Sequence, residues 1–411
     1  MAETKNKNIG IMIAVAIIVI AAIVYFTQQK PKEVVVEKEE IKMGIILGFT
    51  GPIESLTPAM AASAELAFKE ASDSGSLLGG STIKAERADS TCVDSAAATA
   101  AAEGLVSGGV VAIMGADCSG VTGAIATNVA VPNGVVMISP SATSPGLTDL
   151  DDNGLFFRTA PSDARGGQVL ADITKDRGVK SIAVTHTNND YGKGLADVYV
   201  AAVKSHGINV TTVTAHEEGK ADYGAEVATL AAAGGDALAV LGYLDQAGGS
   251  IIGGSIDSGA FDVFVLSDGM IGDSLTDRFG DDLNKSFGSL PGSMGKGASI
   301  FKDVASTAGI DSSGPYTSES YDAAALIVLA MQAGGKADKA TVQANVMSVA
   351  NAPGEKIYPG ELKKALELLA SGKAVDYEGA SSVEFTDVGE ASGAFIEKEI
   401  KGGKFKDKKQ R

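Results

Sequence analysis

The chain has 411 residues, of which 45% are hydrophobic, and its formal net charge at pH 7 is −17. A chain of this length can form two domains with separate cores, and its hydrophobic content excludes an intrinsically disordered protein. The negative charge argues against nucleic acid as a partner, because it would repel the phosphates.

The N-terminal segment 9–26 is apolar and carries no charged residue. About 18 residues in a helix span about 27 Å, close to the thickness of the hydrocarbon core of a bilayer. The sequence that follows Ala22, IVYFTQQKPK, is a poor cleavage site for a signal peptidase. We therefore expect one N-terminal hydrophobic helix that remains as a membrane anchor, with a cleaved signal segment as the alternative. A charged tether follows it, so residues 1–40 form a separate N-terminal unit.

From residue 42 onward the sequence alternates between apolar runs and segments with helical periodicity. The expected strands are 42–49, 82–88, 110–114, 135–138, 181–185, 210–214, 237–241 and 263–266. The expected helices between them are 58–71, 94–105 with Asp94 as its cap, 121–129, 168–175, 195–204, 223–233 and 247–258. This alternation predicts an α/β fold with parallel sheets and helices on both faces, and the number of units predicts two lobes.

Two turns rich in small hydroxyl residues follow expected strands. They are GADCSG at 115–120 and MISPSATSPGLTD at 137–149. Ser119 stands just before the helix at 121–129, and a helix start with a serine cap can bind a carboxylate. Two such turns facing one crevice would hold a small zwitterion, whereas the alternative is that SPSATSP is only a solvated loop.

Four further residues follow strands or lie in a loop of suitable composition. Ligands of open α/β sheets bind beyond the carboxyl ends of the strands. Tyr191 in DYGKG, Tyr243 in GYLDQAG and Asp268 in SDGM occupy such places, and Tyr316 lies in DSSGPYTSES. The alternative for Asp268 is a simple turn former, because Asp-Gly is a common turn pair.

Taken in this order, these segments resemble the type I periplasmic solute-binding proteins that serve branched-chain amino-acid ABC transporters. The resemblance covers residues 41–405. It implies two doubly wound lobes with parallel sheets, joined by hinge crossovers, with lobe 1 formed by 42–160 and 293–390. Lobe 2 would then consist of 161–292 and 391–405.

The resemblance also implies a disulfide between Cys92 and Cys118, which are the two cysteines of the chain. Both follow the ends of expected neighbouring strands, and an exported location would favour oxidation. Two unrelated buried thiols are the alternative.

An α-amino acid needs donors for its carboxylate and acceptors for its ammonium. By the resemblance, Ser119 and Thr143, with their backbone amides, would bind the carboxylate. The ammonium would then be bound by the Ser141 carbonyl, the Thr143 hydroxyl and Asp268, which supplies the opposite charge. The other expected ligand contacts are Ala142 in the same turn and the pocket walls Tyr191, Tyr243 and Tyr316.

Two positions depart from the pattern of the branched-chain binders. Leu56 or Ser55 stands where leucine-type proteins usually carry an aromatic residue, and Asp117 stands where they usually carry an apolar one. A carboxylate beside an aliphatic pocket is costly unless it is solvated or paired. The departures predict a polar, basic or broad range of amino acids, with an amide-like or other small organic solute still possible.

Motifs for enzymatic chemistry are missing from the sequence. It contains neither HExxH nor GxSxG, and His186, His206 and His216 lack the spacing of metal ligands. The run GSMGKG lacks the first glycine of a phosphate loop, and DYGKG does not complete a dinucleotide fingerprint. We therefore expect no enzyme, no metal and no cofactor.

The predicted function is that of the substrate-binding component of an ABC importer, whose lobes close on a small ligand. The expected partners are a permease and its ATPase subunits, and the expected oligomeric state is a monomer. The expected location is periplasmic or otherwise extracytoplasmic, tethered through residues 9–26 or released. The alternative is a membrane-anchored sensory or regulatory protein that binds a small amide or organic solute.

Overall fold

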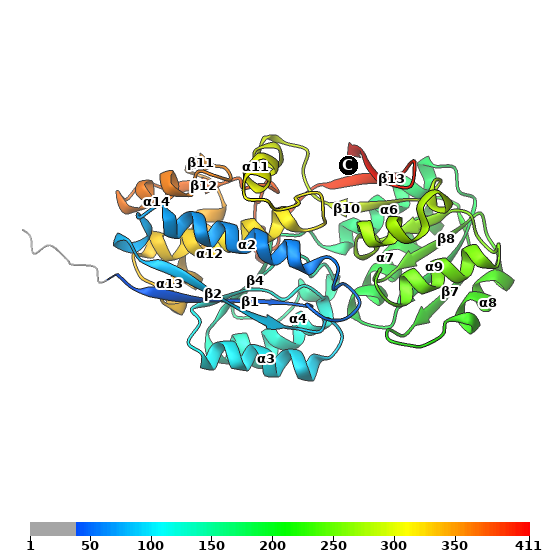
Figure 1. Cartoon of the computed structure of the whole chain (residues 1–411), viewed down its shortest axis with the longest axis horizontal. Coiled ribbons are helices and arrows are strands. Elements are labelled where there is room, and N and C mark those ends of the chain that lie inside the picture. Colours follow the sequence, from blue (N-terminus) through cyan, green and yellow to red (C-terminus); the bar gives the residue numbers. More distant parts are fainter. Residues whose placement is uncertain (1–37) are drawn as a thin grey trace, which may run out of the picture. The chain divides into compact units, whose positions relative to one another are not determined.

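The computed structural model describes residues 38–411, which form two lobes that each contain a central β-sheet (Figure 1). The expected hydrophobic helix at 9–26 lies outside the described residues. Within residues 38–411, no helix combines the length and the apolar composition that crossing a bilayer requires.

The sheet of the first lobe has five parallel strands in the order β2-β1-β3-β4-β5. The strands are β1 (Glu40–Leu47), β2 (Thr82–Asp89), β3 (Ala112–Gly115), β4 (Val136–Ser139) and β5 (Phe156–Arg158). Every residue of β3 and β4 is buried, because helices cover both faces of the sheet and leave these strands no solvated side. This double burial explains why the sequence shows them as continuous apolar runs.

Six helices accompany this sheet. They are α2 (Thr57–Asp73), α3 (Ser95–Ser107), α4 (Ser119–Ile125), α12 (Thr317–Gly334), α13 (Lys339–Ala350) and α14 (Leu362–Ala370). Helix α3 begins as predicted, with the Asp94 carboxylate accepting hydrogen bonds from the Ala96 and Ala97 amides. Helix α12 packs against α2 and is buried over almost its whole length. A small two-stranded sheet of β11 (Glu355–Ile357) and β12 (Val375–Tyr377) lies near α14 (Figure 1).

The second lobe has a seven-stranded sheet in the order β14-β13-β10-β9-β8-β6-β7. The strands β6 (Ser181–Thr187), β7 (Asn209–His216), β8 (Ala237–Leu241), β9 (Phe264–Leu266) and β10 (Phe287–Pro291) are parallel. The helices of this lobe include α6 (Asp163–Asp176), α7 (Asp190–Ser205), α8 (Gly224–Ala233), α9 (Ala247–Asp257) and α10 (Asp273–Phe279).

Two antiparallel strands complete this sheet, which is therefore mixed rather than purely parallel as predicted. Strand β13 (Phe395–Ile400) pairs antiparallel with β10, and β14 (Phe405–Gln410) pairs antiparallel with β13. The two form a tight hairpin in which Gly402 and Gly403 have positive φ angles of 62° and 65°. A short hairpin can only join antiparallel strands, and such turns need residues that tolerate positive φ.

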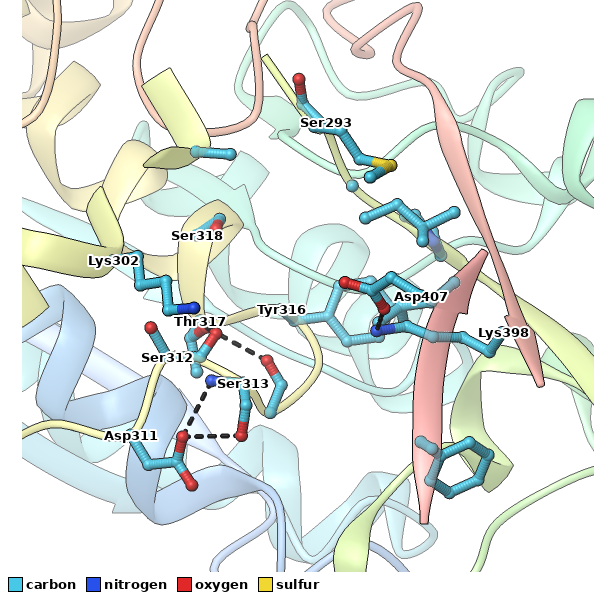
Figure 2. Close-up of a pocket in the computed structure, with 18 of the residues that line it drawn as sticks. Ser293, Lys302, Asp311, Ser312, Ser313, Tyr316, Thr317, Ser318, Lys398 and Asp407 are labelled. Atoms are coloured by element: carbon cyan, nitrogen blue, oxygen red, sulfur yellow. Dashed lines mark hydrogen bonds and ion pairs between the residues drawn. The ribbon is translucent and has the colours of Figure 1, made fainter. Parts of the chain in front are cut away.

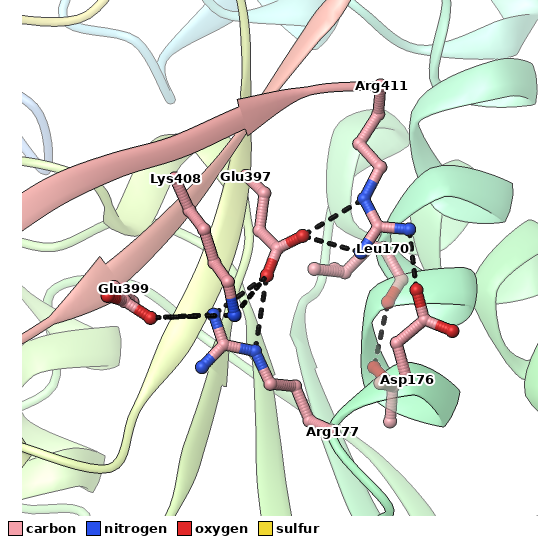
Figure 3. Close-up of polar contacts among 8 residues, drawn as sticks. Leu170, Asp176, Arg177, Glu397, Glu399, Lys408 and Arg411 are labelled. Carbon is pink, nitrogen blue, oxygen red and sulfur yellow. Dashed lines mark hydrogen bonds and ion pairs between the residues drawn. The ribbon is translucent and has the colours of Figure 1, made fainter.

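An ion-pair cluster fastens this hairpin to α6 (Figure 3). Glu397, which is buried, accepts hydrogen bonds from Arg177 at 2.7 Å and from Arg411 Nε at 3.0 Å. Arg411 also binds Asp176 at 2.7 Å. Burial raises the pKa of the Glu397 carboxyl, but the two guanidinium groups outweigh burial and hold that pKa below its ordinary value.

The chain passes between the two large sheets three times. The connections lie between β5 and α6, between β10 and α11 (Lys296–Thr307), and just before β13. Three connections that run side by side allow the lobes to rotate about them. We retain the division of lobe 1 into 42–160 and 293–390, and of lobe 2 into 161–292 and 391–405, as a proposal.

Candidate functional site

A small cavity lies between the lobes, beyond the carboxyl ends of strands from both sheets. Its walls are formed by Ile53, Leu56, Met60, Asp117, Cys118, Ser119, Ser141, Tyr191, Tyr243, Asp268, Gly269 and Tyr316. Eight of the ten residues proposed as ligand contacts are among them; Ala142 and Thr143 lie in the same turn but not on the cavity wall. The cavity has a volume of about 30 Å³, so in this closed arrangement the side chains occupy much of the space that a ligand would need.

The lobe 1 wall is built on the turn after β4. The Ser141 hydroxyl donates to the Asp117 carbonyl at 3.1 Å, and the Ser144 amide donates to the Ser119 hydroxyl at 3.1 Å. The Thr143 hydroxyl is buried and has no hydrogen-bond partner within the described residues. A buried polar atom without a partner is costly, and a ligand could supply that partner.

Ser119 does not cap α4, contrary to the sequence prediction. Cys118 is the cap residue, with extended backbone angles, and its carbonyl accepts from the Thr122 amide at 2.9 Å. Ser119 is the first helical residue, so its hydroxyl is free to join the hydrogen bonds of the turn after β4.

Arg158 supports the same turn from below, and the sequence analysis did not include it among the site residues. Its guanidinium donates to the carbonyls of Ala142 at 3.0 Å and Ser144 at 2.8 Å, and it pairs with Glu390 at 2.5 Å. Arg158 is almost fully buried. It ends β5, a strand of only three residues that carries no clear periodic signal.

Asp117 has its full set of partners within lobe 1. Its carboxylate accepts hydrogen bonds from the Gly48 amide at 2.6 Å, the Cys118 amide at 2.9 Å and the Ser90 hydroxyl at 3.0 Å. Burial raises the pKa of the Asp117 carboxyl, and these donors partly oppose that shift. The carboxylate therefore needs no ligand charge to be accommodated, and it ties together the ends of three strands.

The predicted disulfide is confirmed. Cys92 and Cys118 are bonded, with their Cα atoms 5.1 Å apart. The bridge joins the loop after β2 to the start of α4, so it holds Ser119 at the rim of the cavity.

The lobe 2 wall is organised around Asp268, which follows β9. The Tyr191 hydroxyl donates to Asp268 Oδ1 at 2.6 Å, and the Tyr316 hydroxyl, from the start of α12, donates to Oδ2. Tyr243 stacks on Tyr191 with ring centroids 5.2 Å apart. Burial raises the pKa of the Asp268 carboxyl, and the two tyrosine hydrogen bonds partly oppose it. Burial, reinforced by this carboxylate, raises the pKa of both Tyr191 and Tyr316 well above the ordinary value.

The rim of the cavity is closed by hydrogen bonds between the lobes. The Asp245 amide donates to the Pro52 carbonyl at 3.1 Å, and the Asp245 carboxylate accepts from the Ser55 amide at 2.9 Å. At a second point, the Ser144 hydroxyl donates to the Asp190 carbonyl at 3.0 Å. The structure is therefore that of the closed state.

A wider groove of about 640 Å³ opens on the other side of Tyr316 (Figure 2). Lys302, Asp311, Lys398 and Asp407 bring charges of both signs to it, with Lys398 and Asp407 forming an ion pair. Because these charges balance, the groove shows no preference for a ligand of either sign. The interlobe cavity is the better candidate for the functional site.

The family model of the periplasmic binding proteins matches residues 40–357. Leu/Ile/Val-binding protein homolog 3 of Brucella melitensis biotype 1 is 32% identical over 219 residues, which are 51% of this chain. The match spans 56% of that protein's own length. A leucine-, isoleucine-, valine-, threonine-, and alanine-binding protein of Pseudomonas aeruginosa is 28% identical over 306 residues, which are 73% of this chain and 80% of that protein.

Two solved structures share the fold with different ligands. A branched-chain amino acid transporter substrate binding protein from Streptococcus pneumoniae, in complex with isoleucine, has a TM-score of 0.74 and 21% identity, covering 90% of this chain and 99% of that one. An ABC transporter solute binding protein from R. palustris, in complex with benzoate, has a TM-score of 0.70 and 17% identity, covering 90% of this chain and 96% of that one. The fold is therefore compatible with both amino acids and simple aromatic carboxylates.

Proposed function

Because the chain belongs to the periplasmic binding protein family, we propose that it is the extracytoplasmic substrate-binding component of an ABC importer and that its ligand is an α-amino acid. The proposal rests mainly on one observation: Asp268, buried in the wall between the lobes, is hydrogen-bonded only by neutral groups. A buried carboxylate favours a cationic partner, which the ammonium of an amino acid would supply. A ligand that carries only a carboxylate, such as benzoate, would meet a like charge there.

The opposite wall suits the other end of an amino acid. Ser119, Ser141 and Thr143 would bind the ligand carboxylate through hydroxyls and backbone amides at the start of α4 and in the turn after β4. Three apolar side chains, Ile53, Leu56 and Met60, would line the path of the ligand side chain. They favour an aliphatic or broad range of amino acids over a basic one, since the Asp117 carboxylate already has its own partners.

The mechanism is closure of the two lobes about the three connecting segments. Ligand contacts on both walls, Ser119 from lobe 1 and Asp268 from lobe 2, are made together only when the lobes are closed. A ligand therefore stabilises the closed state by its differential affinity. The closed form would be recognised by a permease and its ATPase subunits, with the protein acting as a monomer, either tethered to the membrane through residues 9–26 or released.

A ligand screen on the full chain tests this proposal. Thermal unfolding is followed by circular dichroism with L-amino acids, their D-enantiomers, benzoate and urea, since the absence of tryptophan limits intrinsic fluorescence. A ligand at a hundredfold excess over its Kd should stabilise the protein by ~2.7 kcal/mol. Stabilisation by one or more L-amino acids supports the proposal, and stabilisation by benzoate or urea alone contradicts it.

A further inference from the structure

A second small cavity lies behind Asp268 and connects it to another acidic side chain. This cavity has a volume of about 10 Å³, and Asp163 and Asp268 both line it. Asp163 is the first residue of α6, and its amide donates to the Thr143 carbonyl at 2.8 Å. The start of α6 is thus attached to the turn that would bind the ligand, and it brings a second carboxylate to the same place.

Two polar atoms at this point have no hydrogen-bond partner within residues 38–411. They are Asp163 Oδ2 and the Thr143 hydroxyl oxygen. Asp163 is 3% exposed and Thr143 is 1% exposed, so water does not freely reach either atom. Buried acceptors and hydroxyls of this kind are normally satisfied, and their convergence indicates a place for a donor from a ligand.

The charges around the two carboxylates do not balance. The nearby cation is Arg158, whose guanidinium is already engaged by Glu390 and by the carbonyls of Ala142 and Ser144. The other titratable groups facing the pair are the phenols of Tyr191 and Tyr316.

The remaining wall of the small cavity is uncharged and consists of Gly166, Leu170, Leu195, Ser267, Ser289, Pro291 and Phe395. Two buried like charges without a free cation cannot both be ionised at low cost.

We propose that Asp163 and Asp268 form a two-carboxylate seat for the ligand ammonium, and that this seat holds one proton when it is empty. On binding, the ammonium keeps its own protons and donates hydrogen bonds to the carboxylates, and the proton of the pair leaves to solvent. No covalent bond forms or breaks. Asp163 thereby becomes a second specificity-determining residue, which restricts the site to ligands that carry an ammonium group.

The electrostatics of the two groups agree with this assignment. Burial, followed by the charge of Asp268, raises the pKa of the Asp163 carboxyl well above its ordinary value. The deprotonated pair is the form that binds a cation. The apparent affinity should therefore fall as the pH falls through the raised pKa, by at most about tenfold per pH unit.

Calorimetry on the full chain tests the inference, which rests on the proposed function. L-isoleucine is titrated in phosphate and in Tris at the same pH, between about pH 5 and pH 8, because the difference in heat reports the protons released. Should another amino acid stabilise the protein more in the screen, it replaces L-isoleucine as the probe. We expect release approaching one proton per bound amino acid at the acidic end of this range.

Two variants assign the proton. Asp163→Asn should bind the amino acid without proton release and with an affinity that changes little with pH. Glu319→Gln is the matched control, since Glu319 is equally buried but does not line either cavity, and it should keep the release. If Asp163→Asn does not fold, infrared difference spectra of the unmodified protein should still show loss of a protonated carboxyl band on addition of the amino acid.

The outcomes separate the two proposals. No binding of any amino acid contradicts the proposed function itself. Binding without proton release in the unmodified protein, or release that persists in Asp163→Asn, leaves the function intact and overturns the two-carboxylate seat.

Discussion

Tyr316 and Asp268 come from different lobes and meet in a hydrogen bond across the interlobe cavity. Tyr316 lies at the start of α12, in the first lobe, and its hydroxyl donates to the carboxylate that follows β9 in the second. The group proposed to bind the ligand ammonium therefore has partners from both lobes, and its full hydrogen-bonding set exists only in the closed state.

Replacing Asp268 by asparagine should weaken amino-acid binding by ~2–5 kcal/mol, because it removes the charge partner of a buried ammonium. Tyr316→Phe should cost less, about 1 kcal/mol, since it removes one hydrogen bond and keeps the charge. Calorimetry on the folded variants measures both. Tyr321→Phe is the matched control, because Tyr321 donates to the Glu70 carboxylate away from the cavity, and an equal loss of affinity there would remove the special role of Tyr316.

Arg158→Met should lower both stability and affinity. The substitution leaves Glu390 and two carbonyls of the ligand-binding turn without their buried partner, which costs roughly 3–5 kcal/mol in similar cases. Arg177→Met removes a comparable arginine–carboxylate pair in the second lobe, with Glu397. That control should lose stability and keep its affinity, so a similar loss of affinity in both would show that Arg158 acts only through global stability.

The parts of the fold that the sequence predicted are those with a strong local signal. Strands β3, β4 and β8 are buried on both sides and read as uninterrupted apolar runs. Strands β5, β11 and β12 have three residues each, too few for a periodic pattern.

Strand β13 contains the run EKE, which looks like solvated surface, and it is buried because the arginines of α6 and β14 pair with Glu397. That pairing is a tertiary contact that no local window contains. The adjacent Gly402-Gly403 pair was an available signal for the hairpin.

The same distinction holds for the candidate site. Tyr191, Tyr243 and Asp268 follow strands, and the rule for open α/β sheets placed them correctly beside the cavity. Asp163 and Arg158 reach the site only because the crossover between the lobes folds back on the turn after β4. Their positions depend on that long-range packing rather than on a motif.

Glu319→Gln should stabilise the protein at alkaline pH. Burial raises the pKa of the Glu319 carboxyl to about 8, and the neighbouring Asp322 adds to the shift. Between the unfolded pKa near 4.5 and this folded value, the native state holds more protons than the unfolded state, so stability falls as the pH rises through that window. The variant should gain roughly 2 kcal/mol or more at about pH 8 and little at about pH 5, measured by urea unfolding. A gain of equal size at both pH values would contradict the assignment of the titration to Glu319.

The double substitution Cys92→Ser and Cys118→Ser should lower stability by roughly 3 kcal/mol, because the bridge closes a loop of 26 residues in the unfolded chain. Reduction of the unmodified protein should have the same effect, and unfolding in urea with and without reductant measures it. The affinity for the ligand should fall as well, since the bridge holds Ser119 at the cavity. Unchanged stability on verified reduction would contradict this role.

Asp245→Ala should act on the lifetime of the closed state rather than on the ligand contacts. Asp245 lies at the rim, where its carboxylate accepts from the Ser55 amide at 2.9 Å and from the Ser274 hydroxyl at 2.9 Å. Loss of these exposed hydrogen bonds should weaken affinity by about 1 kcal/mol, mainly through faster dissociation, because affinity differences among related variants lie mostly in that rate. Stopped-flow displacement of a bound amino acid measures the rate. Asp257→Ala, at the end of α9 and away from the rim, is the control for loss of a negative charge. A variant at Asp245 that slows association and leaves dissociation unchanged would show that this residue guides the encounter and does not hold the lobes closed.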